Sequence, residues 1–281
     1  MPREANTKLF KLYARPKLRE PVLLAAWPGV GNVALIVASY LAKKLNFKHL
    51  GELESSYFFD PMGVIVRDGI VEAPSFPQNR FYYWKNPKGA QDIILFIGEQ
   101  QPAAKSYELA NAVLDMGVRF MLQRVYTFAA ALTRIHHTEQ PKAWAVATSP
   151  ELAESLKEYS GTQRNLQIAG LNGLVLGVAK ERQFDAVCLL GEVPMYATRV
   201  QNPMAALAII KLLSSIMGFE IDLAELTHVA NETREDMKRA AAEAMEEYID
   251  YFTEPIWEQG QDEEEEEDEE EEEDGDSGRE N

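Results

Sequence analysis

Cysteine is almost absent from this sequence, and so are long apolar runs. A single thiol, Cys188 among 281 residues, excludes an internal disulfide and a metal site built from cysteines alone. Because Cys188 lies in the apolar stretch 186–190, we expect a buried, inert thiol. The longest apolar runs have six or seven residues, against the roughly 20 that span a bilayer. Residues 1–6 lead into no apolar signal region. These absences predict a cytoplasmic protein without a membrane segment.

Basic residues are also few: 28 Lys and Arg stand against 45 Asp and Glu, for a net charge of −17. The imbalance comes from residues 261–281, which hold 15 acidic residues and one basic residue. Residues 1–260 keep a net charge of only −3, which excludes a body-wide basic surface for nucleic acid. The tail has little apolar surface to bury and is predicted to be disordered. Two roles remain open for it, a solubilising extension or a polyanion that competes for a basic partner.

Apolar runs that suit buried strands alternate with helical patterns along residues 21–221. The expected strands are 21–27, 80–84, 92–98, 125–131, 143–147 and 185–190, and the expected helices are 33–45, 103–116, 170–180 and 203–217. Arg67-Asp68-Gly69 between two β-branched runs predicts a hairpin. This alternation predicts an α/β domain with a largely parallel sheet and a hairpin insertion near residues 55–85.

The ends of the helices have their own signals. Asn32 is an expected N-cap, and Asn202 followed by Pro203 opens a helix that Gly218 ends. Asp222 and Glu225 resemble a capping box at the start of a last helix, which could break near Asn231. The predicted organisation is an N-terminal extension (1–20), an α/β core (21–221), a C-terminal helical segment (222–256) and the acidic tail (261–281).

The turn Gly29-Val30-Gly31-Asn32 follows a strand and precedes a helix, where α/β folds bind phosphate. It lacks the dinucleotide fingerprint because position 34 is Ala, and it lacks the Lys-Ser/Thr of a P-loop. Gly29, Gly31 and Asn32 are therefore candidate ligand-binding residues, and a tight turn without a ligand is the alternative.

Glu99 and Glu192 each follow a strand and a glycine. If the two carboxylates faced each other across a crevice at the strand ends, they could raise one another's pKa and act as an acid/base pair. The alternative is that each carboxylate accepts backbone N–H groups at a turn. Asn172 and Tyr196 are possible companions on the rim of this crevice.

The histidine pair His136-His137 has no further ligand at a metal-binding offset. No catalytic constellation, metal site or cofactor is predicted.

Several motifs together resemble the proteasome assembly chaperone 2 family over roughly residues 20–240. They are Gly29-Val30-Gly31-Asn32-Val33, Tyr57-Phe58-Phe59-Asp60-Pro61, Gly98-Glu99, Ala169-Gly170-Leu171-Asn172-Gly173, Leu190-Gly191-Glu192-Val193-Pro194-Met195-Tyr196 and Asn202-Pro203-Met204-Ala205-Ala206. The resemblance implies a three-layer core with helices on both faces, similar to phosphorylases and hydrolases. It also implies use as a protein-binding scaffold and self-association, as a trimer by analogy.

The sequence departs from the family in two respects. Some assembly and activating factors end in a hydrophobic-Tyr-any motif, whereas this sequence ends Gly278-Arg279-Glu280-Asn281, so that docking mode is not expected. The acidic tail is not part of the family pattern, and no residues match phosphorylase catalytic groups.

The resulting hypothesis is a non-enzymatic, chaperone-like homo-oligomer that binds protein partners and neither nucleic acid nor membrane. The alternative is a small-molecule-binding protein or enzyme, with a nucleoside-like or carboxylate ligand in the strand-end crevice.

Overall fold

The computed structural model describes residues 9–61, 63–88, 91–159 and 166–253, with side chains up to residue 246. Contacts between residues divide the chain into two units, Met1–Met237 and Lys238–Asn281. The division falls inside the last helix, α6 (Ala224–Thr253). The expected acidic tail and residues 1–8 of the expected N-terminal extension lie outside the described residues. In the described part of the chain, no helix combines the length and apolarity that crossing a membrane requires.

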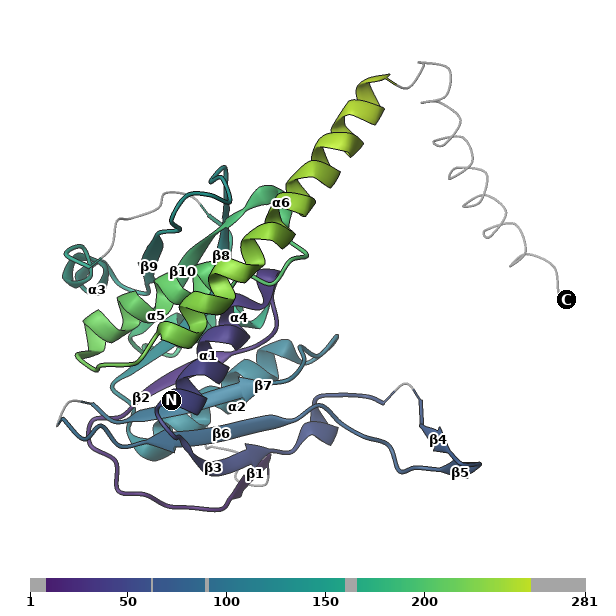
Figure 1. Ribbon diagram of the computed structural model, residues 1–281. Helices are drawn as coiled ribbons and strands as arrows, with labels where there is room; N and C mark the ends of the chain where they lie inside the picture. The colour runs from purple at the N-terminus through teal and green to yellow at the C-terminus, as the bar shows by residue number, and fades with distance from the viewer. Residues whose placement is uncertain (1–8, 62, 89–90, 160–165, 254–281) are drawn as a thin grey trace, which may run out of the picture. The chain divides into compact units, whose positions relative to one another are not determined.

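The first unit contains an eight-stranded mixed sheet in the order β1-β3-β6-β7-β2-β8-β10-β9 (Figure 1). In that order the strands are Phe10–Leu12, Lys48–Leu53, Asn79–Trp84, Ile93–Gly98, Val22–Ala26, Arg124–Thr133, Ala186–Pro194 and Ala143–Ala147. The four central strands β7, β2, β8 and β10 are parallel. Strand β3 points the same way, because it is antiparallel to β6, which is antiparallel to β7. Five of the eight strands therefore share one direction, and their carboxyl ends meet at one edge of the sheet.

The central strands are apolar along their whole length because helices cover both faces of the sheet. Every residue of β2 is buried. Alternate residues Val22 and Leu24 pack with α1 (Val33–Lys44) and α5 (Pro203–Met217) on one face. Leu23 and Ala25 pack with α2 (Ser106–Phe120) and α4 (Gly170–Glu181) on the other. This arrangement confirms the three-layer α/β fold.

The hairpin insertion is also present, as a separate two-stranded sheet of β4 (Val66–Arg67) and β5 (Ile70–Val71). Asp68 and Gly69 both adopt positive φ, at 52° and 78°, as the tight turns that join hairpin strands require. Strands β1 and β3 were not predicted. Half of β3 is exposed or only partly buried, so its sequence lacks the continuous apolar run that identifies β2 and β7.

The helix-end predictions had mixed outcomes. The Asn202 side chain accepts a hydrogen bond from the Ala205 N–H at 2.9 Å, and Gly218 ends α5 at φ 65°. Asn32 precedes α1 but is left-handed, with φ 50°, and its side chain makes no capping bond. Asp222 accepts from the Ala224 N–H at 3.0 Å, whereas Glu225 does not complete a capping box.

Glu225 instead pairs with Lys43 and Lys44 on α1. Helix α6 runs without a break through Asn231. The part of α6 that belongs to unit 1 buries Leu226, Ala230 and Met237, and Leu226 is part of the core of that unit. The short α3 (Pro150–Ser155) begins at Ser149, whose hydroxyl accepts from the Leu152 N–H.

Candidate functional site

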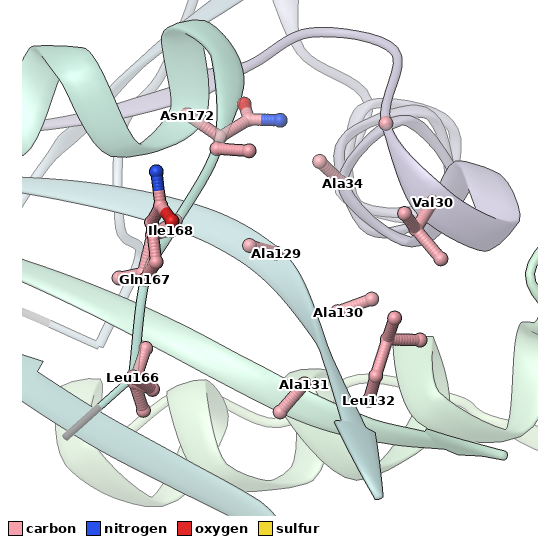
Figure 2. A pocket seen from close by; sticks show the side chains of 12 residues that line it. Val30, Ala34, Ala129, Ala130, Ala131, Leu132, Leu166, Gln167, Ile168 and Asn172 are labelled. Atoms are coloured by element: carbon pink, nitrogen blue, oxygen red, sulfur yellow. The ribbon is translucent and has the colours of Figure 1, made fainter. Parts of the chain in front are cut away.

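A cavity of about 340 Å³ opens at the carboxyl ends of β2 and β8, where ligand crevices lie in α/β folds. Its walls are the β2–α1 turn, the end of β8 and the segment leading into α4 (Figure 2). The lining residues are Gly29, Val30, Ala34, Ala129, Ala130, Ala131, Leu132, Leu166, Gln167, Ile168, Ala169 and Asn172. Of the predicted site residues, Gly29 and Asn172 line this cavity, and Gly31 and Asn32 belong to the turn beside it.

Asn172 holds the end of β2 in place. Its Oδ1 accepts from the Trp27 N–H at 3.0 Å, and its Nδ2 donates to the Trp27 carbonyl at 3.2 Å. Asn172 is buried, with 3% of its surface exposed. Trp27 lies one residue beyond the last paired residue of β2, and the Asn172 side chain forms the hydrogen bonds with its backbone that a neighbouring strand would otherwise form. Both polar atoms of the Asn172 side chain are therefore hydrogen-bonded within the protein.

The Gln101 side chain and the Asn202 backbone also fix the turn. Gln101 donates to the Pro28 carbonyl at 2.6 Å and accepts from the Leu171 N–H at 2.8 Å, so it ties the turn to the start of α4. The Asn202 N–H donates to the Gly31 carbonyl at 2.8 Å, which ties the turn to α5. Gly31 has φ +60°, and a Cβ there would lie 3.0 Å from the Asn202 Cβ. The two structural reasons for glycine at position 31 are this conformation and this contact.

The cavity has the character of an apolar recess. Its twelve lining residues in the described part of the chain include no ionisable side chain, and Gln167 and Asn172 are the polar side chains among them. An uncharged lining supplies no general acid, no general base and no counter-charge for a phosphate or carboxylate. The chemistry that this surface favours is contact with apolar groups.

Glu99 and Glu192 lie elsewhere and apart from each other. Glu99 accepts from the Gln78 N–H at 2.8 Å, where β7 meets β6. Glu192 accepts from the Lys142 N–H at 2.7 Å, where β10 meets β9. Strands β7 and β10 are separated by β2 and β8, which places them about 14 Å apart. The proposed carboxylate pair is therefore wrong, because each carboxylate holds the end of an antiparallel neighbour of its own strand.

Tyr196 lies on the short helix Met195–Ala197 and contacts the histidine pair. Its hydroxyl accepts from the His137 N–H at 2.9 Å and lies 3.0 Å from the His137 Nδ1. Burial raises the pKa of Tyr196, and the His137 hydrogen bond partly offsets this. The rings of His136 and His137 lie 4.0 Å apart. In the described part of the chain, no three His, Cys, Asp or Glu residues are grouped to hold a metal ion.

Cys188 lies on β10 and is fully buried, as expected. Burial raises its pKa to about 12, so the thiolate that a nucleophile requires is scarce at neutral pH.

Sequence reasoning missed Gln101 and the wall formed by Leu166 and Ile168. Gln101 follows a strand end in the same loop as Glu99, so its position was a usable signal. Leu166 and Ile168 precede a predicted helix, and nothing in the local pattern indicates that they face β8.

The fold is a three-layer α/β domain, and the polar side chains at its strand ends form hydrogen bonds with the backbone of neighbouring turns and strands. The sequence model of the PAC2 family matches residues 23–241, and the chain belongs to this family.

Three similar proteins illustrate the relationship. The crystal structure of Pyrococcus furiosus PbaB, an archaeal proteasome activator, shares 28% sequence identity with a TM-score of 0.71, covering 83% of this chain and 98% of that one. Pyrococcus furiosus PbaA, an archaeal homologue of a proteasome-assembly chaperone, shares 22% identity with a TM-score of 0.62, covering 84% and 99% of the two chains, and supports the fold alone. The Methanocaldococcus jannaschii protein MJ1210 is 28% identical over 214 residues, which span 74% of this chain and 78% of the relative.

Proposed function

We propose that this chain is a non-enzymatic, chaperone-like scaffold that binds subunits of a proteasome-type particle during its assembly or activation. The observation that carries the proposal is the similarity to the proteasome activator PbaB, which extends over 98% of that structure. Membership of the PAC2 family over residues 23–241 supports the same role.

The geometry of the strand ends favours a scaffold over an enzyme. The side chains of Asn172 and Gln101 and the backbone N–H of Asn202 hold the β2–α1 turn. Glu99 and Glu192 hold the ends of strands β6 and β9. An enzyme of this fold uses groups at the strand ends to bind and transform a substrate. Here those groups form hydrogen bonds within the protein, and the cavity between them has an uncharged lining.

A direct binding experiment tests the proposal. The purified full-length chain, immobilised, is incubated with proteasome α and β subunits from its own organism, at low and at physiological salt. We expect retention of assembly intermediates or of the assembled ring, together with a change in the rate of assembly or of peptide hydrolysis.

A variant truncated after Gly260 is the matched control, because it removes the polyanionic segment and keeps the domain. Retention by the truncated chain at physiological salt attributes binding to the domain. If neither form binds any proteasome subunit and a metabolite copurifies instead, the scaffold role is contradicted.

A further inference from the structure

The β4–β5 hairpin, residues 63–72, carries a concentration of exposed apolar side chains. We call it the arm. Val64, Ile65, Val66, Ile70 and Val71 are all more than half exposed, and Ile70 reaches 71%. Isolated exposed apolar residues are normal on a protein surface, but five β-branched residues on one short hairpin form a contiguous patch.

The hairpin register separates two faces of the arm. Val66 pairs with Val71, so their side chains share a face, and Val64 lies two residues earlier on that same face. This face is entirely valine. The opposite face carries Ile65 and Ile70 with an ion pair between Arg67 and Glu72, whose atoms lie 3.3 Å apart. The arm thus has one apolar face without charge, and its charges on the other face are largely balanced.

The base of the arm is anchored although its tip is exposed. The Lys105 Nζ donates to the Tyr57 carbonyl at 2.7 Å and lies over the Tyr57 ring. On the return strand, the Gln78 N–H donates to Glu99, and Asn79 Nδ2 donates to Ser55 Oγ at 3.0 Å. These contacts attach to the domain the two chain segments between which the arm lies, while residues 63–71 themselves are exposed. Figure 1 shows β4 and β5 beyond the end of the sheet.

We propose that the arm of one copy docks into the strand-end cavity of a second copy of this chain. The cavity has an apolar, uncharged lining, and Val30 and Leu132 on its walls are 40% and 46% exposed. A valine face without charge is complementary to such a recess. A polyanionic segment such as residues 262–274 is not, because the lining residues that the structure describes include no cation to pair with it.

Topology explains why the arm docks between copies and not within one. Arm and cavity lie at the same edge of the sheet, because the arm follows the carboxyl end of β3 and the cavity lies at the carboxyl ends of β2 and β8. Strands β6 and β7 separate β3 from β2. Within one copy the arm is exposed throughout residues 63–71 of the described chain, so its own cavity does not receive it.

Such a contact joins two different surfaces, so each copy donates one arm and offers one cavity. Contacts of this kind close into rings or continue into filaments. The net charge of −17 opposes association at low salt, whereas apolar contact does not weaken with salt. The inference concerns self-association and stands independently of whether the client is a proteasome subunit.

Three variants test the inference by light scattering at micromolar concentration in physiological salt. We expect the wild type at twice 31.7 kDa or more. The arm variant, Val64→Thr with Val66→Thr and Val71→Thr, keeps side-chain shape and strand propensity, and we expect a monomer. The cavity variant, Val30→Lys with Leu132→Lys, places charge on exposed positions of the cavity wall, and we expect a monomer again. The control, Val118→Thr on α2 with Val229→Thr on α6, changes exposed apolar residues elsewhere and should keep the wild-type mass.

Mixing the two monomeric variants gives the decisive result. The arm variant still offers an intact cavity and the cavity variant still donates an intact arm, so the mixture should form a dimer through one intact contact. A cooperative thermal unfolding transition in every variant establishes that each is folded. A wild-type monomer, an arm variant or a cavity variant that keeps the wild-type mass, or a mixture that stays monomeric would each overturn the proposal.

A crosslink provides an independent measurement. Val66→Cys and Leu132→Cys, carried on separate copies, should form an intermolecular disulfide under mild oxidation. Cys188 does not interfere because it is fully buried. Absence of a crosslink between these positions, with the oligomer intact, would show that the arm docks elsewhere.

Discussion

The side chain of Asn172 forms two hydrogen bonds with the backbone of Trp27, a residue 145 positions away in the sequence. An amide is suited to this role because it offers one donor and one acceptor in the same plane as a peptide group. Neither group of Trp27 lies within the strand ladder that ends at Ala26. The cost of removing a partner from a buried donor or acceptor is larger than the net gain from forming the bond, so Asn172 is expected to contribute strongly to stability.

Asn172→Ala should therefore destabilise the domain by about 3 kcal/mol, with two buried backbone groups left without partners. For a domain of this size the melting temperature should fall by roughly 6–12 °C. Thermal unfolding followed by circular dichroism measures the change. Gln167→Ala is the matched control, since Gln167 lines the same cavity but is exposed, and it should shift the midpoint very little. Equal shifts for the two variants would contradict the role given to Asn172.

Replacing glycine by alanine should have opposite effects on stability at Gly31, which lies in a strained turn, and at Gly177, which lies within a helix. At Gly31 the backbone has φ +60° and the new Cβ would lie 3.0 Å from the Asn202 Cβ, so Gly31→Ala should cost about 1–3 kcal/mol. Gly177 lies within α4 with no atom within 4 Å of an added Cβ, so Gly177→Ala should stabilise by about 0.5–1 kcal/mol. Chemical denaturation gives both values. Shifts of the same sign would show that the turn tolerates alanine and that its glycine has another purpose.

At the scale of elements, the start of α6 and the end of α1 are joined by ion pairs. Lys44 pairs with Asp222 at 3.3 Å and with Glu225 at 3.1 Å, and Lys43 pairs with Glu225 at 2.6 Å. A backbone bond from Ala224, then Lys44, lowers the pKa of Asp222. Lys43, then Lys44, lowers the pKa of Glu225, and the two carboxylates raise the pKa of Lys44. All of these groups are at the surface, so their contribution to stability is small and sensitive to salt.

The direction of the pH dependence follows from these shifts. Carboxyl groups with a lowered folded-state pKa stabilise the protein above their ordinary pKa near 4, and this contribution is lost as the pH falls through the folded-state values. Lys44→Met should lower the melting temperature by no more than a few degrees at pH 7. The difference from wild type should close toward pH 3 and in about 1 M salt, where the screening length is about 3 Å.

Melting curves from pH 7 to 3 test this. Lys211→Met on α5 is the control, since the described residues show no ion pair for Lys211, and its effect should not vary with pH. A Lys44→Met effect that persists at pH 3 would assign the loss to packing of the Lys44 side chain and not to its charge.

At the scale of the whole molecule, the two parts of the charge distribution have different consequences. Residues 1–260 are close to neutral, and residues 261–281 carry −14. The last 21 residues contain no aromatic or aliphatic side chain, so ordering them gains almost no hydrophobic free energy. Fixing each residue would cost about 1–2 kcal/mol, and repulsion between neighbouring carboxylates adds to that cost.

Truncation after Gly260 should therefore leave the fold and the oligomeric state intact and change the melting temperature by no more than a few degrees. If residues 261–281 bind a basic partner, that binding should weaken steeply between low and physiological salt and disappear in the truncated chain. Melting curves, light scattering and binding at two salt concentrations measure these effects. Loss of the fold on truncation, or binding that salt does not weaken, would show that this segment docks in a specific way.

The sequence by itself determined the parts of the structure that depend on neighbours along the chain. Continuous apolar runs identified β2 and β7, Asp68-Gly69 identified the hairpin, and Asn202 with Gly218 marked the ends of α5. Each is a local preference for one backbone conformation or one degree of burial. The family resemblance predicted the three layers, which the structure confirms, and the family match confirms the membership.

The tertiary structure alone decided which strand ends meet. Glu99 and Glu192 follow similar local sequences, Ile97-Gly98 and Leu190-Gly191, yet the strand order places two strands between them. Their partners, Gln78 and Lys142, are fixed by the antiparallel neighbours β6 and β9, and no local pattern encodes that pairing. The physical reason is that strand order depends on long-range packing of both sheet faces, whereas a residue's local signal reports only its own burial and conformation.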